Sequence, residues 1–215
     1  MKIQLTQKYL PFIIVALCYI YLISCQKEAN RATSAKIIYN DIIPDTIVAS
    51  INTPPIYNLD LNKDGVYDFR FKYTLIFPVE CRPSGGYGSK IYIEVEPANN
   101  SFNEILNVIY SAPNFPDTVP AALDTLIVIG SVSEKWLSSP SQVLRYANSC
   151  CCDRGDYFFD NNDKYLGLKL VKGSQVFYGW VRLNGNLGWN GTPILLKDYA
   201  YNSSPNESIL AGQKE

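Results

Sequence analysis

Alternation between apolar and polar residues is the dominant pattern in the chain, and it is clearest from Val66 to Phe77. The apolar positions there are Phe69, Phe71, Tyr73, Leu75 and Phe77, and the polar ones are Asp68, Arg70, Lys72 and Thr74. A period of two places these sets on opposite faces of a β-strand. We therefore expect a half-buried antiparallel strand with the apolar set inside.

The same period predicts further strands and little helix. The expected strands are Lys90–Glu96, Ile105–Tyr110, Thr125–Ser131, Tyr165–Val171, Gln175–Leu183 and Ile194–Tyr201. Gly173-Ser174 predicts a tight hairpin turn between two of them. The only helical signal is a turn or two within Glu134–Tyr146, starting from a Ser133 cap and broken by Pro140. The sequence thus predicts an all-β domain, an antiparallel β-sandwich or a related double-sheet fold.

The N-terminal residues have the layout of a secretory signal. Lys2 and Lys8 precede an apolar run from Tyr9 to Ile23, and a small residue, Ser24, follows the run. This order of charged, apolar and small residues is typical of a cleaved export signal. A transmembrane anchor is the alternative, although the run is shorter than the roughly 20 residues that a spanning helix needs.

The residue after this signal indicates a lipid anchor. Leu-Ile-Ser-Cys, ending at Cys25, resembles the lipobox of bacterial lipoproteins, in which the cysteine thiol carries diacylglycerol. The resemblance implies a signal peptide over 1–24 and a lipidated Cys25, and the polar residues up to 35 read as a flexible tether. The single domain then spans 36–215, held in the bilayer by acyl chains at about 0.8 kcal/mol per buried CH₂. We expect an outer-membrane lipoprotein of the bacterial envelope, facing the periplasm or the cell surface.

Composition excludes several classes of function. The chain has no histidine, which rules out a Ser-His-Asp triad, a Cys-His dyad and a His-ligated zinc site. Loss of Lys2 and Lys8 with the signal leaves 17 basic and 20 acidic residues. The resulting negative charge gives no basic surface for nucleic acid, so we expect no nucleic-acid partner.

Four cysteines remain in the predicted domain: Cys81, Cys150, Cys151 and Cys152. Thiols outside the cytoplasm usually form disulfides. Adjacent cysteines pair badly, so we expect Cys81 to bridge to one of the other three. A metal site is the alternative, but three consecutive residues cannot easily face one ion.

The segment Asn58–Phe71, NLDLNKDGVYDFRF, carries the strongest chemical signal. Its candidate ligands for calcium are Asp60, Asn62, Asp64, the Val66 carbonyl and Asp68, at positions one, three, five, seven and nine of the loop. Calcium prefers six to eight hard oxygen ligands, and Gly65 permits the sharp turn that gathers them. Phe71 stands where an EF-hand has its bidentate Glu, and a strand follows. The loop therefore resembles the calcium loops of integrin alpha-chain repeats of the FG-GAP type. The alternative is an Asx-rich turn that binds nothing.

Two other features carry weaker signals. A second acidic stretch comprises Asp153, Asp156, Asp160, Asn161, Asn162 and Asp163, and we expect a solvated loop there rather than an ion site. Trp189, in Gly-Trp-Asn-Gly, lies in a loop setting that suits stacking on a sugar ring, so it is a possible ligand contact, but core packing across a hairpin is the interpretation we prefer. Trp180 lies within a predicted strand and is expected to be structural.

The order of several segments resembles an uncharacterised family of secreted and lipid-anchored Bacteroidota proteins. These segments are DLNKDGVYDFRF, KYLGLKLV, FYGWVRLNG and LLKDYAYNSSPNESILAG, and the region Pro78–Ser149 has no counterpart. The resemblance covers about half of the predicted mature chain. It implies a β-fold, calcium and an envelope location, and it implies no activity.

Two classes of function follow. The first is a non-catalytic binding or scaffold module with a calcium-stabilised β-domain, whose partner is a glycan or an envelope protein. The alternative is an envelope hydrolase such as a glycosidase, which needs two carboxylates about 5–10 Å apart. By residue type, Glu94, Glu96, Glu104 and Asp156 are its candidate acids. We expect the first class.

Overall fold

The computed structural model describes only part of the chain. The described residues are 36–48, 56–81, 85–99, 101–109, 118–133, 135–138, 141–150, 153–156 (backbone only), 162–185 and 194–215. All of them belong to one unit, Lys36–Glu215, and the predicted signal peptide (1–24) and tether (25–35) lie outside them. The described part is all-β, with antiparallel sheets and no helix, which confirms the predicted fold class. It accordingly holds no helix capable of crossing a bilayer.

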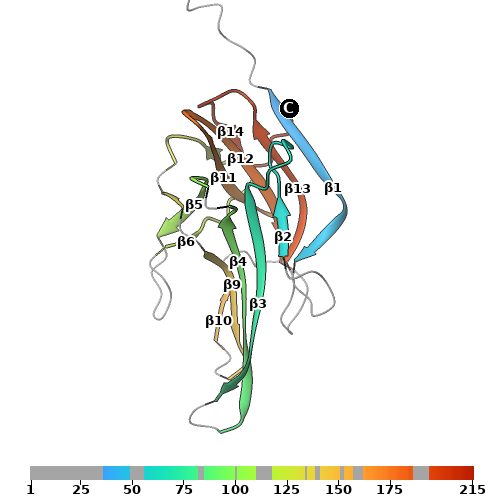
Figure 1. The fold of residues 1–215 in the computed structure, drawn as a ribbon, viewed down its shortest axis with the longest axis vertical. Helices are drawn as coiled ribbons and strands as arrows, with labels where there is room; N and C mark the ends of the chain where they lie inside the picture. Colours follow the sequence, from blue (N-terminus) through green and yellow to red (C-terminus); the bar gives the residue numbers. More distant parts are fainter. Residues whose placement is uncertain are drawn as a thin grey trace, which may run out of the picture. The chain divides into compact units, whose positions relative to one another are not determined.

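The larger sheet has seven described strands (Figure 1). In spatial order they are β1 (Ile37–Val48), β13 (Ile194–Asn202), β12 (Gln175–Asn184), β11 (Lys164–Lys172), β5 (Glu104–Ile109) and β6 (Thr118–Pro120), with β8 (Trp136–Leu137) also paired to β5. The predicted turn at Gly173-Ser174 joins β11 to β12, and Gly173 has a φ of 61° there. Glycine adopts this left-handed conformation at little cost, which explains its place in the hairpin.

The second sheet contains five described strands. Their spatial order is β10 (Asp153–Asp156), β9 (Gln142–Asn148), β4 (Tyr87–Pro97), β3 (Phe69–Glu80) and β2 (Ile56–Leu59). Buried apolar side chains of the two sheets form one core, to which β3 contributes Phe69 and Phe71 and β11 contributes Leu166, Leu168 and Leu170. The predicted sandwich is thus two sheets packed across a shared apolar layer.

A smaller core lies on the other face of the larger sheet. It is covered by the pair β7 (Val128–Ile129) and β14 (Ile209–Leu210). Trp180 is fully buried there, with the Tyr165 ring edge-on at a centroid distance of 5.1 Å. Such aromatic pairs stabilise by about 0.5–1.5 kcal/mol beyond the area they bury. The structural role predicted for Trp180 is confirmed.

The expectation for the apolar face of β3 is only half right. Phe69 and Phe71 are fully buried, but Leu75 is 43% and Phe77 is 68% exposed. β3 stays paired with β4 as far as Glu80, while its contribution to the core ends near Tyr73. The alternation therefore continues along a part of the strand whose apolar face the larger sheet does not cover.

Two predicted elements are wrong in type or length. The helical turn expected within Glu134–Tyr146 is instead β8 and the start of β9, in which Leu144 enters the core. The Ser133 hydroxyl accepts the Gly130 N–H at 3.1 Å, so it closes a turn rather than capping a helix. The strand expected over Thr125–Ser131 shrinks to β7, because a turn occupies Asp124–Ile127 before it.

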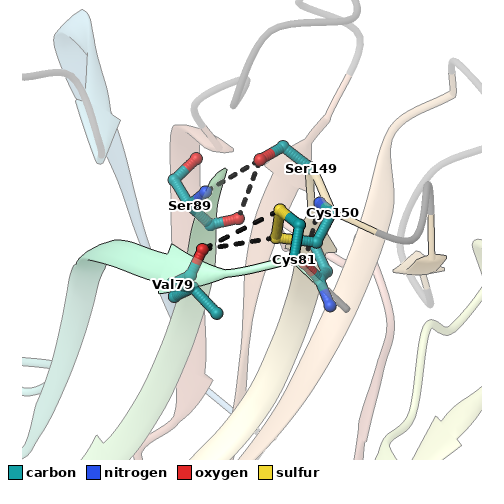
Figure 2. Close-up of a disulfide and its surroundings, with 6 residues drawn as sticks. Val79, Cys81, Ser89, Ser149 and Cys150 are labelled. Carbon is teal, nitrogen blue, oxygen red and sulfur yellow. Dashed lines mark hydrogen bonds between the residues drawn. A yellow bond between two sulfur atoms is a disulfide. The ribbon is translucent and has the colours of Figure 1, made fainter. Parts of the chain in front are cut away.

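Cys81 and Cys150 form a disulfide at the far end of β3 (Figure 2). It closes a separation of 69 residues, for which the chain-entropy model gives a stabilisation of roughly 4 kcal/mol. A Cβ added to Gly88 would lie 2.5 Å from the Ser149 hydroxyl and 2.6 Å from the Cys150 sulfur, so only glycine fits beside the bridge. Cys151 and Cys152 lie outside the described residues.

Candidate functional site

The predicted calcium loop joins β2 to β3, and its polar side chains fold over its own backbone. The Asp60 carboxylate accepts N–H bonds from Asp64 at 3.2 Å and from Gly65 at 2.7 Å. The Asn62 side-chain oxygen accepts a second bond from the Asp64 N–H at 3.2 Å, and the Asp64 carboxylate accepts the Val66 N–H at 2.9 Å. These bonds turn three of the predicted ligand side chains toward the concave side of the loop.

Apolar residues between the acidic ones anchor the loop in the core. Leu59, Leu61 and Phe69 are all buried. Leu61 packs close to Gly179 of β12, since a Cβ at Gly179 would lie 3.2 Å from a Leu61 methyl carbon. Asp68 is only 2% exposed and accepts the Leu61 N–H at 2.9 Å. The loop therefore has a fixed apolar base and a polar rim.

A lysine from a distant strand enters this rim. The Lys172 ammonium, at the end of β11, lies 2.8 Å from an Asp64 carboxylate oxygen and 3.4 Å from an Asp68 oxygen. The hydrogen bond from Lys172, with that from the Val66 N–H, holds the pKa of Asp64 below its ordinary value. Burial lowers the pKa of Lys172, but its contacts with the two aspartates outweigh burial and raise it overall. Lys172 therefore stays charged at neutral pH.

Asp68 behaves differently because it is buried. Burial raises the pKa of Asp68 above its ordinary value, although the Leu61 N–H and the Lys172 charge both act in the opposite direction. The third carboxylate, Asp60, has no ion-pair partner in the described part of the chain. The Lys172 ammonium thus contacts two of the three loop carboxylates, which leaves negative charge that a further cation could neutralise.

The donor set fits calcium in chemistry. All five predicted ligands are oxygens, four from side chains and one from the Val66 carbonyl, and calcium prefers such hard donors. In this structure, however, Lys172 bonds to two of the carboxylates. Within the described residues, no group of three or more His, Cys, Asp or Glu side chains converges as a metal centre would. Calcium at the loop therefore stays a prediction.

A second group of charges lies elsewhere on the larger sheet, and the sequence did not reveal it. Asp198 of β13 is fully buried and receives two hydrogen bonds of 2.7 Å from the Arg182 guanidinium. Asp198 also accepts hydrogen bonds from the Tyr39 hydroxyl at 2.8 Å and from the Lys214 ammonium at 3.3 Å. Arg182 and Asp198 are direct cross-strand partners in β12 and β13. The sequence did contain a signal for this pair, because Arg182 and Asp198 carry opposite charges within two largely apolar strands.

Asp163 belongs to this second group, which corrects the prediction of a solvated loop at that residue. It accepts bonds from Arg182 at 3.1 Å, Asn184 at 2.6 Å and Lys197 at 3.0 Å. Burial raises the pKa of Asp163, but the bonds from Asn184 and Lys197 and the neighbouring positive charges outweigh it and lower the pKa overall. Of the rest of that stretch, Asp153 and Asp156 lie in β10, Asn162 is exposed, and Asp160 and Asn161 are outside the described residues.

The candidate acids of a hydrolase have individual polar partners. Glu94 accepts bonds from Ser141 at 2.7 Å and Thr74 at 3.3 Å. Glu96 pairs with Lys72 at 2.7 Å and with Arg70 at 3.3 Å, and Glu104 pairs with Lys169. These contacts support the sheet. The side chain of Asp156 and the whole of Trp189, the possible ligand contact, lie outside the described residues.

Two cavities open on the described surface. One, of about 540 Å³, is lined by Arg70, Glu96, Asn99, Ser101, Phe102 and Ser138. The other, of about 640 Å³, is mainly apolar and lies between β5 and β7, with Val108, Ile109 and Val128 in its wall. Volumes of this size are ordinary for small-ligand pockets.

Comparison with known proteins adds no relative. No protein-family model, no curated protein and no solved structure matches the chain significantly. The resemblances to lipid-anchored Bacteroidota proteins and to integrin-type calcium loops therefore stay predictions.

Proposed function

We propose that this protein is a lipid-anchored module of the bacterial envelope whose β-domain is stabilised by calcium and binds a partner without catalysis. The metal ligands are Asp60, Asn62, Asp64, Asp68 and the Val66 carbonyl. The anchor is a lipid on Cys25.

The charge balance of the Asp60–Asp68 loop is the observation that carries the proposal. The loop has three carboxylates, the Lys172 ammonium contacts only Asp64 and Asp68, and burial makes ionisation of Asp68 unfavourable. A divalent cation would supply the missing positive charge and replace hydrogen bonds that now hold the loop closed. Its role is structural, because the apolar base of the loop is part of the sandwich core.

A thermal melt of the full chain, kept in a zwitterionic detergent, tests the calcium site. Extracellular calcium modules bind with Kd on the order of 10⁻⁴–10⁻³ M, so 10 mM calcium stabilises by about 1.4–2.7 kcal/mol relative to chelator. For a domain of this size the Tm rises by roughly 3–10 °C.

Asp64→Ala is the matched variant for this melt. It should abolish the calcium-dependent rise while costing about 1 kcal/mol in chelator, where it loses exposed contacts: the ion pair with Lys172 and the hydrogen bonds from the Val66 N–H and the Asn62 side chain. An equal loss in both buffers would mean that the loop is a turn and not a metal site.

Membrane fractionation tests the anchor separately. Cys25→Ser removes the thiol that would carry the lipid, so the protein should move from the membrane to the soluble fraction. Retention in the membrane would instead support the transmembrane alternative. Cys18→Ser, within the same apolar run, is the control and should leave the protein in the membrane.

A further inference from the structure

We infer that the 540 Å³ cavity between Arg70 and Phe102 is the binding site for the partner, and that it takes a short neutral oligosaccharide. This inference rests on the proposed function, because it assigns a place and a chemical class to the partner of a non-catalytic module. The site differs from the possible contact at Trp189.

The Phe102 ring is the first reason. It is 83% exposed, on the short connection between β4 and β5, and it lines the cavity. An aromatic ring so exposed is not there for packing, whereas its flat apolar face suits the C–H face of a pyranose ring. The surrounding polar groups can then reach the hydroxyls at the edge of the sugar.

Those polar groups present both donors and acceptors. The Arg70 guanidinium has five N–H donors, and within the described part of the chain two of them are used, toward Asn58 at 3.3 Å and Glu96 at 3.3 Å. The Ser101 hydroxyl oxygen is buried and has no hydrogen-bond partner among the described residues. Ser138 is exposed at the rim. Sugar hydroxyls donate and accept at once, so they match this mixture.

Charge decides against an ionic ligand. Arg70 and Glu96 are the charged residues in the described lining, and they pair with each other. Lys72 makes a second ion pair with Glu96. Because both charged side chains of the described lining are already engaged in ion pairs, a neutral ligand fits better than a phosphate, a carboxylate or an amine.

Hydrogen bonds tie the cavity wall to the calcium loop. The Asp68 carbonyl accepts the Ala98 N–H at 2.9 Å and the Asn103 side-chain amide at 3.1 Å. Asn99, in the lining itself, donates to the Tyr67 carbonyl at 3.3 Å. Ordering the loop with calcium therefore orders the segment that carries Phe102, and calcium should strengthen saccharide binding.

Saturation-transfer NMR on the full chain, in a detergent without a sugar headgroup, tests the site. The probes are maltotriose, cellotriose, xylotriose and mannotriose, each titrated to 10 mM in the presence of calcium. We expect at least one to bind with Kd on the order of 10⁻³ M. Phe102→Ala should weaken that binding about tenfold, and Phe102→Tyr should retain it.

Val132→Ala is the matched control, because Val132 is 77% exposed and does not line the cavity. Failure of all four sugars to bind protein that calcium still stabilises would overturn this inference and leave the proposed function standing. Equal binding by the wild type and Phe102→Ala would place the sugar elsewhere and also overturn it. Absence of any calcium-dependent Tm rise would count against the calcium loop instead, whatever the sugars do.

Discussion

Two groups of acidic residues in this domain have opposite charge balances. The calcium loop has three aspartates, of which Asp64 and Asp68 pair with the Lys172 ammonium and Asp60 has no ion-pair partner among the described residues. The second group places Asp163 and Asp198 among three cations: Arg182, Lys197 and Lys214. One group lacks positive charge and the other has an excess of it.

This difference in charge balance indicates which of the two groups a metal ion could stabilise. A buried carboxylate is tolerated when it is paired and hydrogen-bonded, and Asp198 meets that condition with protein groups alone. Asp68 is almost as buried but has one N–H bond and one ion pair at 3.4 Å. A group of neighbouring acidic residues therefore indicates a metal site only when the nearby Arg and Lys side chains do not already neutralise it.

The largest predicted effect is at the fully paired group. Asp198→Ala removes the partner of a bidentate arginine and leaves a half-buried guanidinium, which should lower the free energy of unfolding by about 3–5 kcal/mol. Urea unfolding in calcium and in chelator should show the same loss. The exposed Asp45→Ala should change stability by less than about 0.5 kcal/mol. If the loss of stability in Asp198→Ala differed between calcium and chelator, the calcium response would not be confined to the loop.

Removing the competing cation should improve calcium binding. Lys172→Met frees Asp64 and Asp68 from the ammonium, so the calcium affinity should rise about tenfold, equivalent to about 1.4 kcal/mol. Isothermal titration calorimetry measures it directly. Lys169→Met, on the same strand but paired with Glu104, should leave the affinity unchanged. A weaker affinity in Lys172→Met would show that the lysine organises the loop rather than competing with the metal.

Neutralising the buried loop carboxylate should have effects of opposite sign in the two buffers. Because burial raises the folded pKa of Asp68, its ionised form is unfavourable in the fold, and its protonation stabilises the domain as pH falls. Asp68→Asn should therefore raise the free energy of unfolding by up to about 1 kcal/mol in chelator at pH 7. It should also abolish the rise in the free energy of unfolding that calcium gives the wild type. Destabilisation in chelator would indicate that the Lys172 ion pair outweighs the cost of burial.

The smallest effect concerns the pH dependence of the cation-rich group. The folded pKa of Asp163 lies below its ordinary value of 3.8. Its contribution to the free energy of unfolding is therefore present above pH 3.8 and is lost as the pH falls through the folded pKa. Asp163→Asn should cost about 0.5–1 kcal/mol at pH 7 and progressively less as the pH falls below 3.8, measured by thermal melts across this range. Asp124→Asn is the control: its side chain is 77% exposed in an ion pair with Lys164, and the change should cost less than about 0.5 kcal/mol at pH 7.

The regular strands were predictable because burial on one face leaves a period of two in the sequence. β4, β11, β12 and β13 each contain the segment expected from that pattern. The long edge strand β1 escaped prediction, since its partly exposed sequence, IIYNDIIPDTIV, alternates poorly and contains Pro44. β7, β8 and β14 have two residues each, too few for any period to appear.

The candidate site was predictable only where it is local. The Asp60–Asp68 spacing indicated a closed polar loop, and the side-chain bonds to the loop N–H groups agree with that shape. Lys172 could not be found from the sequence, because it lies more than a hundred positions away and reaches the loop only through the packing of the two sheets. Phe102 could not be found from the sequence either, because it lies in a connection between strands, where no alternation of apolar and polar residues marks an exposed side chain.

The Asp198 group also holds the strand through which the chain enters the domain. Ser203 binds the Lys36 carbonyl through both its N–H and its hydroxyl, and Tyr39 reaches Asp198 and Lys214. If the chain is tethered through Cys25 while a partner holds the domain, mechanical load arrives first at these contacts on β1. The buried charges then act as a clamp that resists pulling, a property that equilibrium melts do not measure and single-molecule force spectroscopy does.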